Sequence, residues 1–379
     1  MAIATEHPGL DKQSFASESH PTYRICYIAG REDEYSRTHI VLQTLRENGH
    51  AVVPILPPNK SFKHYPGLLL KFLKTHRECD LIVVGFYGHL LMPFVWLLAR
   101  KPILFDALVS TYFVMRDRLD LKGFSLKAKI FFLLDKMVMA MADKIVMETN
   151  DHIIERHEEF GTPRERFTRI FLPADDNVLQ PRQYSRTDGA FLVHFHGEFA
   201  RFHGVKYIVE AARLLADENV RFQIIGTGQD HAECVALAHK YGLTNCNFID
   251  RVPYAKLAHY MAKADVCLGI FGDTKRTLHE LTNKVIEAMA MGRPIITTDN
   301  APVRELLHHE ESAFLIPPAD PQALAKAIRT LKNNPSHCQQ LGKNAYAVYC
   351  DKCSQKVFSQ AFNQEVLKLV SSKINRKSP

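Results

Sequence analysis

Short continuous runs of apolar residues, separated by amphipathic stretches, recur along the whole chain of 379 residues. Runs of this kind are typical of parallel strands, which are buried on both faces. One of the intervening stretches ends at Gly49, a residue type that often terminates a helix. In the first half of the chain we predict strands at residues 23–29, 51–56, 80–86, 102–108, 144–149 and 169–173.

The same alternation returns in the second half. Here we predict strands at residues 191–196, 220–226, 246–252, 265–271, 294–299 and 313–317, each followed by a helix. This order predicts an α/β protein with two tandem Rossmann-like, doubly wound domains. Such sheets bind ligands beyond the carboxyl ends of their strands, so we expect the two domains to face each other across a ligand-binding cleft.

The alternation breaks at residues 173–189, which are rich in Pro, Asp and Arg and read as an interdomain linker. We therefore expect a disordered tail at 1–21, a first domain at 22–180 and a second domain at 187–350. An amphipathic helix is expected at 354–372. Because no strand follows this helix, it needs an apolar surface on which to dock.

The formal net charge of +7 favours partners that carry phosphate, or an anionic membrane surface. The positive charge is scattered and has no zinc-finger spacing, so nucleic acid is not an expected partner. Residues 1–21 lack the apolar run of a signal peptide, and the longest apolar run, 89–99, is too short to span a bilayer. Several of the eight cysteines lie in apolar strands, as buried free thiols do in cytosolic proteins. We expect a cytoplasmic protein.

Residues 60–77 mix Lys, His and Arg with Leu and Phe at helical spacing. Such a helix can lie on an anionic membrane, which would add peripheral contact with the inner face of the membrane. A core helix with solvated lysines is the competing interpretation, and this stretch alone favours it.

The stretch 193–215 contains a first candidate ligand loop, in which a strand ends at Gly197 and Gly204 opens a helix. Glycine at a strand exit lets the backbone approach a ligand, and the helix start offers free N–H groups to an anion. Arg201 and His203 lie in the loop between them. We predict phosphate binding here; a solvated loop is the alternative.

Two further strand exits lie at the same edge of the predicted sheet. Gly226 ends one strand, and Arg251 and Val252 follow the next. Their backbone groups are candidates to face a nucleobase, although plain structural turns explain these short stretches equally well.

The stretch 281–299 reads as a short helix, a glycine stop and a buried strand. Asn283 is a good N-cap, whereas Lys284 in the first turn opposes the helix dipole unless an anion is bound nearby. Glu287, one turn later, is suited to accept hydrogen bonds from two ribose hydroxyls. We predict that these three side chains form the exposed tip of a core helix, aimed at a nucleotide; a capped helix with two solvated charges is the alternative.

The successive segments HGEFARFHG, IIGTGQD, NKVIEAMAMGRPIITTD and ESAFLIPPADPQALAKAI resemble the carboxyl-terminal domain of the family 4 glycosyltransferases, over roughly residues 190–372. The resemblance implies the two-domain GT-B fold. It also implies transfer of a sugar from a nucleotide-sugar donor, a UDP- or GDP-sugar, to an acceptor. Retention at the anomeric carbon is expected, with no required metal or other cofactor. In this family the last helix crosses back to the first domain.

The resemblance also assigns residues. Gly197 matches the glycine before the phosphate loop, and Glu287 matches the second glutamate of the E-x7-E motif, which holds the ribose. His279 stands where that motif has its first glutamate, and His203 where the loop has a lysine. Arg201 is then the candidate to supply the positive charge of the loop.

In a retaining transferase of this type the leaving diphosphate takes the acceptor's proton, so the protein mainly positions the sugar and stabilises phosphate charge. We assign that role to Arg201, His203, Lys284 and the N–H groups at Gly204 and Asn283.

The acceptor is expected on the first domain. Arg37 and His39 follow its first strand, Asp106 ends its fourth strand near where relatives carry a catalytic-site histidine, and His89 is a further candidate. An ordinary polar loop, a structural strand-end Asp and a packed His are the respective alternatives. Catalytic roles are thus predicted for Asp106, His203 and Glu287.

Two other functions fit the same pattern. One is a non-catalytic nucleotide-sugar binding protein, which the replacement of the motif's first glutamate by His279 keeps in consideration. The other is a nucleotide-sugar epimerase on the same fold. For a transferase, the acceptor is a glycan, a lipid-linked molecule or a small molecule.

Overall fold

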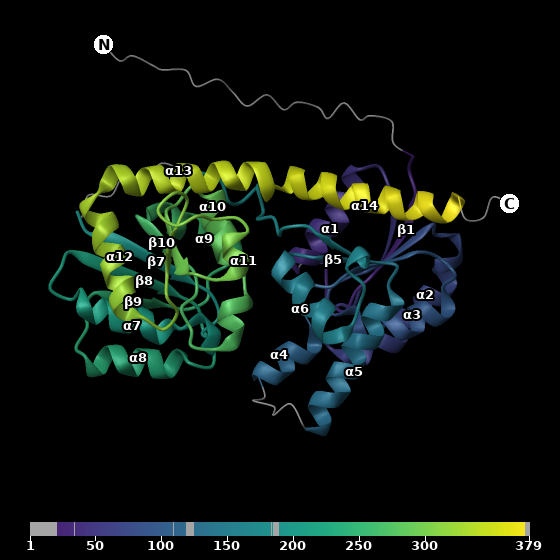
Figure 1. Cartoon of the computed structure of the whole chain (residues 1–379), viewed down its shortest axis with the longest axis horizontal. Helices are drawn as coiled ribbons and strands as arrows, with labels where there is room; N and C mark the ends of the chain where they lie inside the picture. The colour runs from purple at the N-terminus through teal and green to yellow at the C-terminus, as the bar shows by residue number, and fades with distance from the viewer. Residues whose placement is uncertain are drawn as a thin grey trace, which may run out of the picture.

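The structure, a computed structural model, describes residues 21–33, 35–108, 110–118, 125–182, 184 and 189–375. It consists of two α/β domains along which a long helical segment runs near the C-terminus (Figure 1). The predicted tail at 1–21 lies, except for Pro21, outside the described residues.

The first domain is built on a parallel six-stranded sheet in the order β2-β1-β3-β4-β5-β6. Because β1 pairs with both β2 and β3, the winding direction reverses between β1 and β3. The strands are β1 (Arg24–Ile28), β2 (Ala51–Ile55), β3 (Leu81–Val84), β4 (Ile103–Asp106), β5 (Lys144–Met147) and β6 (Phe167–Arg169).

Helices cover both faces of this sheet, because alternate residues of each buried strand point to opposite sides. Cys26 and Ile28 of β1 pack with α2, α3 and α5, whereas Ile25 and Tyr27 pack with α1 and α14. The helices of this domain are α1 (Ser36–Glu47), α2 (Tyr65–Thr75), α3 (Met92–Leu98), α4 (Thr111–Arg118), α5 (Leu126–Met141) and α6 (Asn150–Phe160).

The second domain repeats the plan with a parallel six-stranded sheet in the order β12-β11-β10-β7-β8-β9. Its strands are β7 (Phe191–His196), β8 (Val220–Ile225), β9 (Cys246–Ile249), β10 (Val266–Leu268), β11 (Ile295–Thr298) and β12 (Phe314–Ile316). Its helices are α7 (Val205–Leu214), α8 (His231–Lys240), α9 (Tyr254–Lys263), α10 (Asn283–Ala290), α11 (Ala301–Arg304), α12 (Pro321–Asn333) and α13 (Pro335–Lys352). Here the winding reverses between β7 and β10, which is where open α/β sheets bind ligands.

The predicted fold class, two Rossmann-like domains of the GT-B type, is confirmed. One predicted strand, 169–173, is wrong, because β6 is already complete at Arg169. The apolar residues that follow serve two cores: Ile170 packs into the first domain and Phe171 into the second. This apolar run marks the crossing between domains rather than a strand.

The last helix, α14 (Gln355–Asn375), lies on the first domain and packs against α1. Figure 1 shows α13 and α14 running in succession along one side of both domains. Their junction is tied to the linker by Asp176, whose carboxylate accepts hydrogen bonds from the Tyr349 hydroxyl and, at 2.9 Å, from the Gln355 N–H. The apolar side of α14 that enters the first core consists of Phe358, Phe362, Val366 and Val370.

The contact of α14 can be tested at Phe362, which is fully buried. Removing a buried phenyl ring leaves a cavity, so we expect Phe362→Ala to lower the free energy of unfolding by about 3–5 kcal/mol. Guanidinium unfolding followed by circular dichroism measures this. The control is Gln360→Ala, at an exposed position of the same helix. Equal stability of the two variants would contradict the docking of α14.

Candidate functional site

Helix α10 begins at the carboxyl edge of the second sheet. Lys284 and Glu287 are only 5% and 9% exposed, whereas Asn283 is exposed. The prediction of an exposed charged tip is therefore wrong for these two charged residues. The N-cap is Thr282 rather than Asn283, and its hydroxyl makes no capping bond. Lys284 and Glu287 are thus buried charges that need partners inside the protein.

A directional chain of hydrogen bonds leads to Glu287. Nε2 of Gln223 lies 3.3 Å from the carbonyl oxygen of Tyr260 and 2.8 Å from Nδ1 of His194, so Gln223 donates to both. Nε2 of His194 therefore carries a hydrogen and donates to Nδ1 of His196 at 2.9 Å. Nε2 of His196 then donates to the Glu287 carboxylate at 2.7 Å. This chain fixes the orientation of Glu287.

Burial keeps His194 neutral. Loss of water, and then the neighbouring His196, hold the pKa of His194 well below its usual range. His194 therefore acts as a neutral link, and its task is to orient His196 rather than to transfer a proton.

Lys284 has an unusual environment for an amine. Burial lowers its pKa to about 7, although the charges of Glu287 and Glu280 oppose that change. Its Nζ lies 3.2 Å from Nε2 of His203, and Nδ1 of His203 bonds the carbonyl oxygen of Glu198. Nδ1 must donate to that carbonyl, so Nε2 is free to accept from Lys284.

His203 is consequently held neutral. Burial, followed by the charge of Lys284, keeps its pKa well below the usual range. A neutral imidazole with Nε2 occupied as an acceptor supports Lys284 but does not supply a proton. This argues against a role for His203 as a catalytic acid.

Two glycines make room for this arrangement. Gly197 follows β7 with φ 146°, and a Cβ there would lie 3.0 Å from Cε of Lys284. Gly204 has φ 66°, and a Cβ there would lie 2.4 Å from the backbone of Phe271 and Gly272, which follow β10. The loop that carries His203 thus lies directly on the switch point between β7 and β10.

The remaining donor-site candidates differ in exposure. Arg201 and Arg251 are exposed and Val252 is half-buried. Gly226 follows β8, and Ile225 before it accepts a hydrogen bond from Gly197 N–H at 2.9 Å, which places the two strand exits side by side. The structure thus brings Gly197, His203 and Lys284 together and places Gly226 next to them.

On the first domain, Asp106 is buried in an ion pair. Its two oxygens accept from Nε and Nη2 of Arg37 at 2.9 and 2.6 Å, and the guanidinium lies over the Phe358 ring of α14. Both residues are below 5% exposed. This arrangement is that of a structural ion pair, and it leaves neither side chain open to an acceptor.

The other two acceptor-side candidates lie in different environments. His39 is exposed, 3.7 Å from Asp33. His89 is buried, with Nε2 3.8 Å from the buried Asp135 carboxylate, and is a packed histidine. His39 alone among these four residues is accessible to a ligand in this structure.

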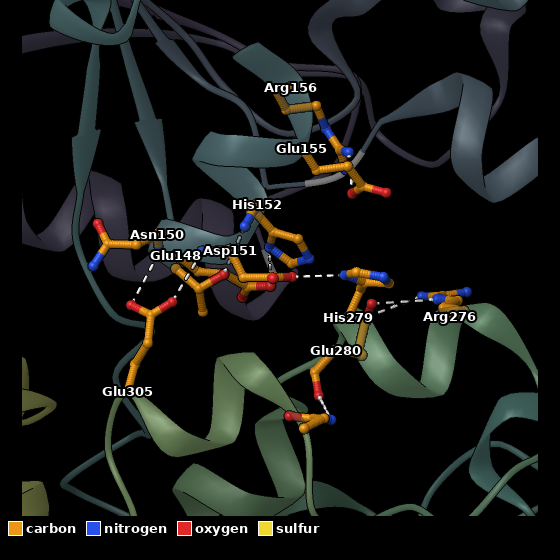
Figure 2. A network of polar contacts seen from close by, with 12 residues as sticks. Glu148, Asn150, Asp151, His152, Glu155, Arg156, Arg276, His279, Glu280 and Glu305 are labelled. Atoms are coloured by element: carbon orange, nitrogen blue, oxygen red, sulfur yellow. Dashed lines mark hydrogen bonds and ion pairs between the residues drawn. The ribbon is translucent and has the colours of Figure 1, made fainter. Parts of the chain in front are cut away.

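His279 belongs to a network between the two domains (Figure 2). Its Nδ1 lies 2.8 Å from Asp151 of α6, on the first domain. Glu305, just after α11, accepts hydrogen bonds from the backbone N–H groups of Asn150 and Asp151 at 2.9 and 3.0 Å. The carboxylate of one domain therefore caps a helix of the other.

Behind this contact, Glu148 and His152 form a buried pair, with Oε1 and Nδ1 3.2 Å apart. Burial raises the pKa of Glu148. Burial acts against the charged form of His152 as well, but the neighbouring Glu148 carboxylate raises the pKa of His152 overall.

Sequence reasoning missed several residues of the site. His194 and His196 are two positions apart on β7 and therefore share one face of a buried strand. Two histidines on one face of a buried strand could have indicated a polar network at this position. Arg276, whose guanidinium lies 3.9 Å from the Phe202 ring centre and pairs with Glu280 at 3.1 Å, carried no comparable signal in the sequence.

Other features of the described residues lie away from this site. A cavity of about 340 Å³ is lined by Tyr112, Phe132, Leu133 and neighbouring residues of the first domain, and not by Lys284 or Glu287. Among the described residues, no group of three or more His, Cys, Asp or Glu side chains is placed to hold a metal ion. No helix in the described part of the chain has both the length and the apolarity to cross a bilayer.

The site region coincides with a known domain family. Residues 179–348 match the family described as Glycosyl transferases group 1. The match spans the second domain from β7 to most of α13. The matched range contains the whole Gln223–Glu287 chain together with Lys284 and His203.

Curated relatives resemble this chain at low identity. The putative colanic acid biosynthesis glycosyltransferase WcaL of Escherichia coli is 24% identical over 234 residues, 59% of this chain and 54% of that protein. The D-rhamnosyltransferase WbpZ of Pseudomonas aeruginosa is 24% identical over 299 residues, 75% of this chain and 73% of that protein. The chain spans about half the length of the first curated relatives that it matches.

Solved structures share the whole fold. Sucrose-phosphate synthase from Thermosynechococcus elongatus superposes with a TM-score of 0.72 at 18% identity, over 92% of this chain and 99% of that one. Anabaena HepE in complex with UDP and glucose gives a TM-score of 0.70 at 14% identity, over 91% of this chain and 99% of that one. At this identity the likeness establishes the GT-B fold.

The depressed pKa of Lys284 predicts a pH dependence of stability. Between pH 7 and 10 the unfolded chain, with an ordinary lysine pKa of 10.5, holds a proton that the folded chain has released. Stability should therefore rise with pH in this window, by up to about 1.4 kcal/mol per unit, relative to Lys284→Met. Guanidinium unfolding of both proteins at pH 7, 8 and 9 measures the difference. Parallel pH profiles of the two proteins would show that the amine is not desolvated.

Proposed function

We propose that the protein is a glycosyltransferase that moves a sugar from a UDP- or GDP-sugar to an acceptor, with retention at the anomeric carbon and without a required metal. The observation that carries this proposal is the buried pair Lys284 and Glu287 at the start of α10, beside Gly197 and the switch point between β7 and β10. A diphosphate beside Lys284 would add to the counter-charge that Glu287 and Glu280 already supply to this buried amine.

The arrangement assigns distinct tasks. Glu287, oriented by His196, accepts hydrogen bonds from the ribose hydroxyls. Lys284, aligned by His203, binds the diphosphate and stabilises the charge that develops on it as the glycosidic bond breaks. The exposed Arg201 and the N–H group of Asn283 add to that stabilisation. The N–H group of Gly204, also predicted for this role, instead donates to the Arg201 carbonyl oxygen at 3.2 Å.

The leaving diphosphate takes the acceptor's proton in this scheme, so no protein acid is needed. That agrees with the neutral, hydrogen-bonded state of His203 and with the occupation of Asp106 by Arg37. Both residues then support the site through structure, and neither acts as a proton donor.

Names of related proteins support the donor class. One solved neighbour, HepE, is described in complex with UDP-glucose. Curated relatives include an alpha-D-kanosaminyltransferase and a D-rhamnosyltransferase, which transfer different sugars. Several solved neighbours are thus described with UDP, whereas the names of the curated relatives give more than one sugar.

Donor binding is tested by thermal unfolding with UDP, GDP, ADP and CMP. We expect UDP or GDP at 100 times its Kd to stabilise the protein by about 2.7 kcal/mol, seen as a rise in Tm. Glu287→Ala and Lys284→Ala should abolish the rise. Lys343→Ala, at an exposed position of α13, is the control and should keep it. An equal rise in Tm for the wild type and all three variants would show that the nucleotide does not bind at the start of α10.

Turnover separates the transferase from its rivals. A sugar-radiolabelled donor should release labelled sugar to water or to an acceptor, with the nucleoside diphosphate as co-product. Tight donor binding without release of label would favour a non-catalytic binding protein. Conversion of the donor to an isomeric nucleotide sugar would favour an epimerase.

We infer a cytoplasmic location with peripheral membrane contact. Residues 60–77 contain η1 (Phe62–His64) and α2, whose side chains Tyr65, Leu68 and Phe72 pack into the core. The interpretation as a core helix with solvated lysines is therefore correct for that side of α2. Membrane contact has to involve its outer side and the helices next to it.

A further inference from the structure

Large apolar side chains on the outside of the protein gather in one part of the first domain. Most of the exposed ones among the described residues lie on η1, on α2, on α3 with the turn η3 (Gly88–Leu90) before it, or on α5. They are Phe62, Leu70, Leu73, Leu90, Phe94, Trp96, Leu97, Leu98, Leu126, Ile130, Leu133 and Met137. We call this set the apolar outer face.

The outer face is continuous from helix to helix. The inner sides of α2, α3 and α5 pack into one core cluster over the same side of the sheet. Helix α3 contacts both α2 and α5, so it lies between them. The outward sides of the three helices therefore form one surface, on the side of the sheet opposite to α14 (Figure 1).

Helix α5 shows that the exposure follows a pattern. Leu126, Ile130, Leu133 and Met137 are spaced at i, i+4, i+7 and i+11, which is one stripe of a helix. A second stripe, containing Val138, packs into the core. A surface helix of a soluble domain needs only the inner stripe, so the outer one requires a separate explanation.

The turn before α3 and α3 itself repeat this pattern. Leu90, Phe94 and Leu97 follow helical spacing, and Leu97 is 73% exposed. Trp96 is 51% exposed beside them and is the chain's only tryptophan. Tryptophan is enriched where protein meets the headgroup region of a membrane.

The charged side chains that α2, α3 and α5 expose are all basic. Exposed lysines stand among the apolar residues, and the three helices carry one acidic residue, Asp135. Asp135 is fully buried and accepts hydrogen bonds from the Ser110 hydroxyl and the Tyr112 N–H. The lysines on the helices are Lys71, Lys74, Lys127, Lys129 and Lys136.

The flanking segments carry further basic residues, together with Glu78 after α2, whose carboxylate pairs with Arg24 at 2.9 Å. Lys60 and Lys63 precede α2, and Arg100 and Lys101 follow α3. Where α5 meets α6, Lys129 and Leu133 line the cavity of about 340 Å³. Glu159 of α6 also lines it and places an acidic residue at the border of this surface.

We propose that the apolar outer face is a docking surface for an anionic lipid bilayer. Its leucines, phenylalanines and Trp96 enter the boundary between headgroups and acyl chains, and its lysines bind lipid phosphates and carboxylates. The helices lie in the membrane plane, since none of those described can cross it. A second copy of this chain fits less well, because two such faces would bring lysines against lysines.

Trp96 provides a direct measurement on the full chain. Vesicles of 70% phosphatidylcholine and 30% phosphatidylglycerol should shift its fluorescence emission to shorter wavelength. Lipids brominated on the acyl chains should quench that emission. Pure phosphatidylcholine vesicles should give a much smaller response. With excitation at the red edge of tryptophan absorption, where tyrosines absorb little, the signal reports on Trp96 because it is the chain's only tryptophan.

Two double variants test the charge. Lys129→Glu with Lys136→Glu should weaken sedimentation with the anionic vesicles by on the order of tenfold or more. Lys326→Glu with Lys343→Glu changes net charge by the same amount at exposed positions of α12 and α13, and should keep at least most of the binding. Equal weakening by both pairs would mean that net charge, and not this surface, drives binding.

A third variant tests the apolar part. Phe94→Gln with Leu97→Gln, both at exposed positions, should remove the vesicle-induced shift while the Tm and the response to nucleoside diphosphate stay unchanged. Absence of a shift in the wild type with anionic vesicles would overturn the proposal. A shift that appears without vesicles and grows with protein concentration would instead assign the surface to self-association. Neither result depends on whether the protein transfers a sugar.

Discussion

The burial of the Lys284 amine is the constraint on which the site depends. The helix that carries it is one of the most buried in the second domain, since Val285, Ile286 and Met289 lie in its core. The amine is therefore held away from water beside an uncharged histidine, His203, with its carboxylate neighbour one turn along the helix. An anion bound beside this amine would stabilise its charged form. The diphosphate of the proposed donor has the appropriate charge.

The two parallel sheets explain why these groups meet. Each strand of a parallel sheet delivers its last residues to the same edge, so His196 from β7 and Glu287 from α10, 91 residues apart in the chain, come into hydrogen-bond contact. The loop around His203 lies on the exit of β10 because Gly204 permits backbone contact there. The order of the strands thus determines where the site lies, and a few side chains determine its chemistry.

Most of the fold could be predicted from the sequence, because buried parallel strands have a distinct signature. The same signature gave a wrong strand at 169–173, where the apolar residues pack into the cores of both domains and form no strand. The start of a helix at Lys284 and Glu287 was predicted, but the burial of these two side chains was not. Periodicity reveals which side of a helix is apolar, and it does not reveal what covers the other side; Lys284 is covered by the loop of His203.

The roles of polar residues on the first domain were harder to predict, because their partners lie far away in the sequence. Asp106 was placed correctly at a strand end, yet its partner Arg37 lies 69 positions away, and a long-range ion pair leaves no local trace in the sequence. His279 presents the same difficulty, since its partner Asp151 belongs to the other domain. Sequence patterns locate the edge of a sheet and do not decide which residues neutralise each other there.

The capping of α6 by Glu305 has a consequence for motion. If the two domains separate, the amide groups of Asn150 and Asp151 lose their acceptor and Glu305 loses its two donors. Water replaces both sets of partners at little net cost, because the groups lie near the surface. The contact thus favours one spacing of the two domains, and breaking it adds little to the free energy of separating them.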